Sequence, residues 1–297
     1  MPLWPLLLLA YQAPATFQSE VSLVQVDAEV LHDKRLVDGL KKDDFRITDG
    51  GRPQEILYFG KEEEPLDLIL VLDVSPSMAR VIRAVADGAD IALRQLQPGD
   101  RVAVMVFDHG VLMDFTDDFP EVGNKIRREA MRTMSTSRIQ KAVDEAALHF
   151  LKQPRTRRRR AVLVITDNRG STNTGRALTD LWEANAVLSG LVVIERASVA
   201  VFSVMQPQSL FIGGIGNLVE KTGGDIVNLG VNVNDTGDGL RRVIERLRMR
   251  YSLHYAMPQA KPGEQRKIKV ELAPESARKY PGADVHARTG YIVPAAR

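Results

Sequence analysis

Hydrophobic positions change their spacing twice along the chain. Between residues 24 and 59, apolar residues alternate with polar ones, as in Val24, Val26 and Ala28, a spacing typical of strands with one buried face. From Leu66 to about residue 250, continuously apolar runs alternate with stretches whose apolar residues recur at helical spacing. From Tyr251 onwards, short strand-like segments broken by Pro and Gly return. The middle pattern predicts a parallel sheet covered by helices, flanked by β structure at both ends.

These changes in pattern set the expected boundaries. We expect an N-terminal β segment over residues 16–62, an α/β domain over 63–250 and a C-terminal β segment over 251–297. Neither β segment is large enough to bury a core alone, so the two are expected to pair into one small β-domain. The predicted fold class is α/β, with a doubly wound, mostly parallel, Rossmann-like sheet and this β-domain beside it.

Individual elements of the α/β part follow from the same spacing. Buried strands are expected at 66–72, 102–107, 161–166 and 199–204. Helices are expected near 82–93, 121–134, 139–150, 177–188, 210–221 and 239–250.

The first buried run ends abruptly in polar side chains. Leu66–Leu72 is followed by Asp73, Ser75 and Ser77, at the expected carboxyl end of a strand. Ligands of open α/β sheets bind at that edge. One carboxylate and two hydroxyls offer only oxygen, which suits hard cations such as Mg²⁺, but they cannot fill six coordination positions. Further oxygens must come from elsewhere in the chain.

Two other polar breaks are candidates to supply them. Ser135-Thr136-Ser137 precedes an expected helix, and Thr166-Asp167 ends an expected strand. If both strands are central, all three breaks meet at one crevice and provide carboxylates and hydroxyls for Mg²⁺, with Mn²⁺ or Ca²⁺ as alternatives.

Asp73-Val74-Ser75-Pro76-Ser77 resembles the D-x-S-x-S motif of the von Willebrand factor A domain, which opens that family's metal-ion-dependent adhesion site. Thr166-Asp167 is similar to the family's T-D-G loop, with Asn168 in place of the glycine. In the family's third loop, Ser137 aligns with the threonine and Thr136 is the alternative, while both glycines of that loop are missing.

The resemblance implies a role for each of these residues. Ser75, Ser77 and the hydroxyl of Ser137 or Thr136 would ligate Mg²⁺ directly. Asp73 and Asp167 would hold the ion mostly through water. The remaining coordination position would accept an Asp or Glu carboxylate of a partner protein.

The flanking segments extend the resemblance beyond the α/β domain. Residues 43–54, 251–255 and 287–291 are similar to segments of a group of secreted bacterial proteins of this family, best known from acidobacteria. Nearly the whole chain is covered by these similarities.

The N-terminal residues predict export. An apolar run over residues 3–10, followed by Ala13-Pro14-Ala15, resembles a signal peptide covering residues 1–15, although no Lys or Arg precedes it. The expected location is secreted or periplasmic. No later run reaches the roughly 18 apolar residues of a spanning helix, so no transmembrane segment is expected in the mature chain.

Composition narrows the chemistry further. The chain has no cysteine, which excludes disulfides, a thiol nucleophile and thiolate-bound zinc. Its formal net charge of +2 argues neither for nor against a polyanionic partner. The arginines at 155 and 157–160 are expected in a solvated loop, and those between 241 and 250 on the solvent face of the last helix. No nucleic-acid partner is expected.

The leading hypothesis is a non-enzymatic, metal-dependent protein-binding module of the adhesion type. One alternative is a Mg²⁺-dependent phosphoryl-transfer or hydrolytic enzyme with Asp73 as nucleophile, although Ser75 stands where such enzymes usually carry a second carboxylate. Another alternative is a metal-free scaffold, in which the serines merely cap helices.

Overall fold

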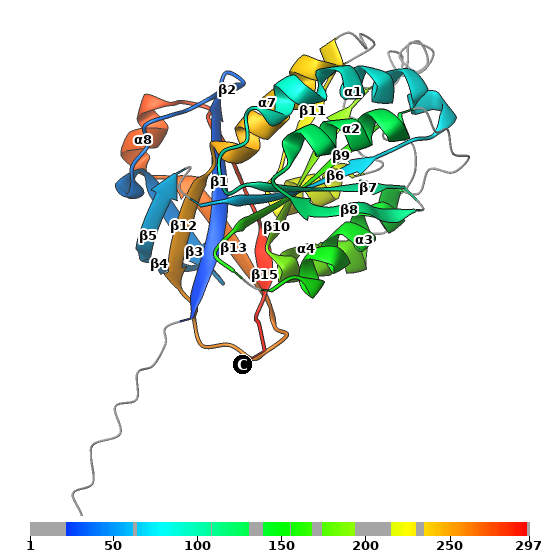
Figure 1. The fold of residues 1–297 in the computed structure, drawn as a ribbon. Coiled ribbons are helices and arrows are strands. Elements are labelled where there is room, and N and C mark those ends of the chain that lie inside the picture. The colour runs from blue at the N-terminus through cyan, green and yellow to red at the C-terminus, as the bar shows by residue number, and fades with distance from the viewer. Residues whose placement is uncertain are drawn as a thin grey trace, which may run out of the picture.

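The computed structural model describes most of the chain in two units (Figure 1). An α/β domain is formed by the middle of the sequence, and a β-domain is formed by both ends. The described residues are 22–61, 64–107, 109–130, 139–154, 156–167, 174–193, 215–229 and 235–295.

The α/β domain is built on one six-stranded sheet. Its strands lie in the order β11-β10-β9-β6-β7-β8, and every neighbouring pair is parallel except β7 and β8. Every residue of β6, β9 and β10 is buried, as the continuously apolar runs require. The strands are β6 (Leu66–Leu72), β7 (Arg101–Val106), β8 (Gly110–Thr116), β9 (Arg159–Thr166), β10 (Ala186–Val192) and β11 (Ile226–Asn228).

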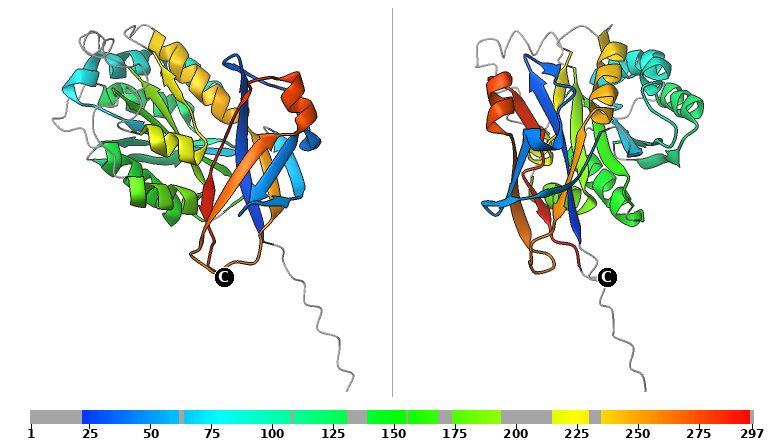
Figure 2. Two further views of the ribbon diagram at one scale, coloured as in Figure 1. Left: turned by 180° about the vertical axis from the view of Figure 1, so that it is seen from behind. Right: turned by 90° about the vertical axis from the view of Figure 1, so that its left-hand side faces the viewer.

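Helices cover both faces of this sheet (Figure 2). Successive side chains of a strand point to opposite faces, so Leu68 and Leu70 pack with one helix layer while Ile69 and Val71 pack with the other. The first layer contains α1 (Ala79–Leu93), α2 (Phe119–Glu129) and α7 (Thr236–Arg248). The second contains α3 (Ile139–Lys152), α4 (Thr174–Ala184) and α6 (Gly216–Thr222). The predicted doubly wound sheet is confirmed.

The β-domain consists of two antiparallel sheets that enclose a separate core. The first contains β1 (Leu23–His32), β2 (Arg35–Leu36), β5 (Ile56–Lys61), β12 (Tyr251–Ala256) and β14 (Asp284–Ala287). The second contains β3 (Phe45–Asp49), β4 (Arg52–Gln54), β13 (Gln265–Leu272) and β15 (Gly290–Ile292). Shorter elements are η1 (Lys42–Asp44), η2 (Pro76–Met78) and α8 (Pro274–Lys279).

The two ends of the chain pair with each other in both sheets. β12 lies between β1 and β5, and β13 pairs with β3. The expected β-domain of N- and C-terminal segments is therefore confirmed. The α/β domain is inserted between the neighbouring strands β5 and β12, whose residues Lys61 and Tyr251 are paired.

One predicted helix includes residues that form a strand in the structure. The expected helix at 177–188 ends in the structure at Ala184, and β10 begins two residues later. Asn185 adopts a left-handed conformation (φ 54°), which stops the helix. The apolar run that follows fits either element by spacing alone. The strand expected at 199–204 lies outside the described residues.

Arginines that were expected in solvent instead join the two domains. Arg246 of α7 binds Glu29 of β1 through two bonds, Nε to Oε1 at 2.7 Å and a terminal nitrogen to Oε2 at 2.9 Å. Arg248 and Arg250 are buried, and Arg250 donates to the carbonyls of Asp27 and His286. The expectation of a solvent-exposed helix face was wrong for these three arginines. Arg246 and Arg250 face the β-domain, and Arg248 pairs with Asp100 inside the α/β domain.

The arginines at 158–160, where β9 begins, are also structural. Arg158 binds the buried carboxylate of Asp67, with Nε 2.6 Å from Oδ1. Arg159 donates to the carbonyl of Arg248 at the end of α7, and Arg160 donates to that of Ala184 at the end of α4. Cations at helix C-termini stabilise the carbonyls that lack helical partners. The prediction of a solvated loop was wrong for these three residues, while Arg157 is exposed.

We expect Arg246→Ala to destabilise the chain by about 3 kcal/mol, since it removes a bidentate partner from a carboxylate that is only 1% exposed. Urea unfolding of the full chain measures the change. Arg83→Ala, at an exposed position of α1, is the matched control and should shift stability by less than about 0.5 kcal/mol. Equal effects of the two substitutions would contradict the interpretation.

Candidate metal site at the carboxyl edge of the sheet

The predicted site residues lie at the carboxyl ends of two adjacent strands. β6 and β9 are parallel neighbours in register, with Leu72 opposite Ile165. Asp73 follows β6 and Asp167 follows β9, so both emerge at the same edge of the sheet. The backbone nitrogen of Asp73 donates to the carbonyl of Ile165 at 3.0 Å, which continues the strand pairing up to the site.

The Asp73 side chain is fixed from two sides. The backbone nitrogen of Ser75 donates to its Oδ1 at 3.0 Å, and the hydroxyl of Thr166 donates to its Oδ2 at 2.8 Å. Asp73 and Thr166 are both fully buried. The carboxylate is thus held in one orientation by β9 and by the turn that follows β6.

The remaining oxygens form a continuous chain toward solvent. The hydroxyls of Ser75 and Ser77 lie 3.2 Å apart, and the Ser77 hydroxyl donates to Asp167 Oδ2 at 2.9 Å. Ser77 is exposed and Asp167 is partly buried, so this side of the cluster is open. The structure therefore brings Asp73, Ser75, Ser77 and Asp167 together, while Thr136 and Ser137 lie outside the described residues.

A short 3₁₀ turn directs the two serines. Ser75 is extended (φ −61°, ψ 158°), and its carbonyl accepts the backbone nitrogen of Met78 at 2.9 Å. Pro76 supplies the φ angle that the first position of such a turn requires. The buried Met78 anchors the turn in the core before α1 begins. The spacing of the serines thus follows from the turn.

Thr166 was not among the residues to which the sequence assigned a role. Its hydroxyl bonds to Asp73 across the gap between β6 and β9. The sequence does show a Thr-Asp pair at the end of a buried run, which places a hydroxyl at the edge of the sheet. The partner of that hydroxyl depends on which strand lies next to β9. Strand order is not encoded in the local pattern.

The donor set suits a small hard cation. All four side chains offer oxygen. The Ser77 hydroxyl lies 2.9 Å from Asp167 Oδ2 and 3.2 Å from the Ser75 hydroxyl, close to the distance of about 3 Å between adjacent ligands of an octahedral Mg²⁺ shell. Over the described part of the chain, no group of three or more His, Cys, Asp or Glu side chains is arranged around a common metal position. The four oxygen donors themselves suit a hard divalent cation better than a metal that prefers nitrogen or sulfur ligands.

A doubly wound sheet with polar side chains converging at its carboxyl edge defines an α/β domain with a candidate ligand site at that edge. Residues 68–171, which include this edge, match the von Willebrand factor type A domain family. The chain therefore carries a von Willebrand factor type A domain. The comparison with curated proteins found no significant match.

The comparison with solved structures also found similar chains. An aerotolerance-related membrane protein from Bacteroides fragilis is 15% identical with a TM-score of 0.44, covering 61% of this chain and 99% of that one. BatB from Bacteroides thetaiotaomicron is 17% identical with a TM-score of 0.43, covering 61% and 98%. Proximal thread matrix protein 1 of the mussel byssus, with a zinc-occupied MIDAS motif, is 13% identical with a TM-score of 0.46, covering 69% and 50%.

We expect Thr166→Val to cost about 2 kcal/mol of unfolding free energy, because it leaves a buried carboxylate oxygen without its donor. Thr166→Ser keeps the hydroxyl but buries less apolar surface. If the hydrogen bond dominates, the serine variant is the more stable of the two in urea unfolding with chelator present. The reverse order would show that packing, and not the bond to Asp73, determines the role of Thr166.

Proposed function

We propose that this chain is a non-enzymatic, metal-dependent protein-binding module of the adhesion type. The observation that carries the proposal is the contiguous oxygen cluster of Asp73, Ser75, Ser77 and Asp167 at the solvent-facing carboxyl edge of the sheet. These residues would hold Mg²⁺, with Ser137 or Thr136 supplying a further hydroxyl. Mn²⁺ and Ca²⁺ are the alternative ions.

The same donor set supports an acidic partner. Serine hydroxyls are neutral, so an ion that they ligate directly keeps much of its positive charge. Ser77 is exposed, which leaves that side of the cluster open to an approaching side chain. A carboxylate of Asp or Glu on a partner protein supplies the anionic oxygen that such an ion favours.

A binding role is proposed over catalysis because the Asp73 carboxylate is buried and hydrogen-bonded. A carboxylate nucleophile must present an oxygen to its substrate. Asp73 is fully buried, and both of its oxygens accept hydrogen bonds from neighbouring groups. The arrangement supports a positioning role in a metal shell.

We also propose that the protein acts outside the cytoplasm, as a secreted or periplasmic protein. The support is the apolar pattern of residues 1–15, which lie outside the described part of the chain. Within the described residues, no helix is both long and apolar enough to cross a membrane. Membership of the acidobacterial-type group stays a prediction.

Metal binding should raise thermal stability. After chelation, Mg²⁺ or Mn²⁺ added to about 100 times its dissociation constant should stabilise the chain by about 2.7 kcal/mol, a shift of several degrees in Tm. Differential scanning calorimetry measures the shift. It should disappear in Asp73→Ala and in Ser77→Ala.

Two further variants keep this test informative. Ser77 is exposed, so Ser77→Ala should fold even if the loss of buried Asp73 does not allow folding. Asp87→Ala, at an exposed carboxylate of α1, is the control and should retain the full shift. A native chain with no saturable shift would refute the metal site and favour a metal-free scaffold.

Partner recognition should depend on an acidic side chain. An immobilised peptide library with a central Asp or Glu is expected to retain the Mg²⁺-loaded chain, while matched Asn or Gln peptides should not. Chelator and Ser77→Ala should each abolish retention. Retention of the amide peptides at equal strength would contradict recognition of a carboxylate by the ion.

A further inference from the structure

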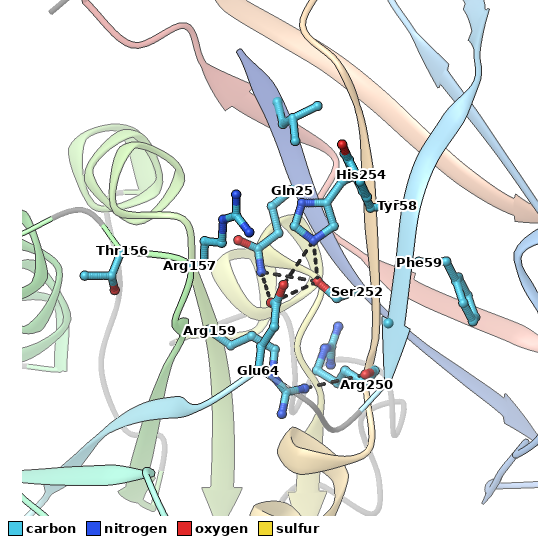
Figure 3. A pocket seen from close by; sticks show the side chains of 12 residues that line it. Gln25, Tyr58, Phe59, Glu64, Thr156, Arg157, Arg159, Arg250, Ser252 and His254 are labelled. Atoms are coloured by element: carbon cyan, nitrogen blue, oxygen red, sulfur yellow. Dashed lines mark hydrogen bonds and ion pairs between the residues drawn. The ribbon is translucent and has the colours of Figure 1, made fainter. Parts of the chain in front are cut away.

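A second candidate site lies at the opposite edge of the α/β sheet, between the two domains (Figure 3). It is a cleft of about 510 Å³, a volume within the range of small-ligand sites. One wall is the outer face of β1, β12 and β5, and the other is the segment before β9. Glu64 precedes β6 and Arg159 begins β9, so the cleft adjoins the amino ends of the strands whose carboxyl ends carry Asp73 and Asp167.

Among the described residues that line the cleft, Glu64 is the one carboxylate, and it already has its partners. Glu64 Oε2 accepts from Gln25 Nε2 at 2.6 Å and from the Ser252 hydroxyl at 3.2 Å. Its Oε1 lies 3.2 Å from His254 Nε2. Figure 3 shows these four side chains joined in one network across β1 and β12. No arginine pairs with Glu64 among the described residues, so the guanidinium groups of the cleft are not neutralised by it.

Three of the described arginines line the same space. Arg157 is exposed and forms no ion pair with a described residue, and Figure 3 shows it on the segment that precedes β9, beside the cleft. Arg159 and Arg250 are 2% and 3% exposed, and their terminal nitrogens donate to backbone carbonyls. The Nε of each has no hydrogen-bond partner in the described part of the chain.

The charge that the cleft exposes is that of Arg157. Arg250 is buried and ion-paired with Glu29 at 3.8 Å, and the carboxylate of Asp27 also favours its charged form. Burial lowers the pKa of Arg250, because removal from water disfavours its charged form. An anion entering the cleft would meet the exposed guanidinium of Arg157.

An aromatic side chain adds an apolar surface. Gln25, His254 and Tyr58 are cross-strand neighbours on adjacent strands and share the face that lines the cleft. Tyr58 is 63% exposed, and its ring stands edge-on to the imidazole of His254. A planar group next to a carboxylate can pack on this ring while its charge reaches Arg157.

We propose that this cleft binds a carboxylate whose apolar or planar body packs on Tyr58, with Arg157 as the principal cationic contact. A guanidinium presents paired donors that match the two oxygens of a carboxylate. The negative charge of the partly buried Glu64, with one exposed arginine among the described lining residues, favours a monoanion over a phosphate or a polyanion. The carboxylate can belong to a small organic acid or to an acidic side chain of a polypeptide.

The test uses the full chain with chelator present, so that no metal-bound carboxylate contributes. Benzoate is titrated by ligand-detected NMR, with benzamide as its neutral isostere and inorganic phosphate as competitor. A capped peptide with one glutamate between two glycines, and its glutamine counterpart, form the second arm. Benzoate should bind saturably, and Arg157→Gln should weaken binding by about tenfold, because a charge-assisted bond is lost.

Matched variants separate this site from general charge and from the Asp73 site. Arg278→Gln, at an exposed position of α8, and Asp73→Ala should both leave benzoate binding unchanged. Tyr58→Ala should weaken it by several-fold, because the ring surface is lost. Tighter binding of the single-glutamate peptide than of benzoate would assign the site to polypeptide side chains, and binding of benzoate alone would assign it to small acids.

Several results would overturn the proposal. These are absence of saturable binding by either carboxylate, equal binding of benzamide, equal losses in Arg157→Gln and Arg278→Gln, or displacement by phosphate at lower concentration. Loss of benzoate binding in Asp73→Ala, with retention in Arg157→Gln, would also overturn it. None of these outcomes depends on whether the oxygen cluster at the other edge binds a metal ion.

Discussion

The buried carboxylate of Glu29 fixes how the two domains are joined. A carboxylate that is 1% exposed must be paired, and its bidentate partner Arg246 comes from the last turns of α7. Within the α/β domain, Arg159 of β9 donates to the carbonyls of Leu247 and Arg248, at the end of the same helix. The junction between α7 and β12 is thus held by charge from both domains. As a result, the amino edge of the six-stranded sheet faces the β-domain, and its carboxyl edge is left for the oxygen cluster.

Much of the fold could be predicted because burial on both faces leaves a clear signal. The continuously apolar β6 and β9 predicted a parallel sheet, and parallel strands that are neighbours must end at one edge. The meeting of Asp73 with Asp167 therefore needed only the assumption that their strands are central. Pairing of the two chain ends was predictable for a similar reason, since neither end has enough apolar surface for a core.

The parts that could not be predicted depend on long-range contacts. Arginines at helical spacing look alike whether water or another domain covers them, so nothing local distinguished Arg246 from a solvent-exposed residue. The start of β10 was missed because one left-handed residue, Asn185, separates two apolar stretches that fit a single helix by spacing. The hydroxyl of Thr166 bonds across a strand boundary, which only the tertiary arrangement determines.

Insertion of the α/β domain between paired strands has a mechanical consequence. Its two connections to the β-domain leave from Lys61 and Tyr251, which face each other at the same end of β5 and β12. A pull on the α/β domain therefore reaches both strands together and in the same direction. β12 is bonded on its other side to β1 over residues 23–28, so tension is resisted by a row of backbone bonds loaded in shear. The ion pairs of Glu29 with Arg246 and Arg250 form a second connection between the domains that resists the same force.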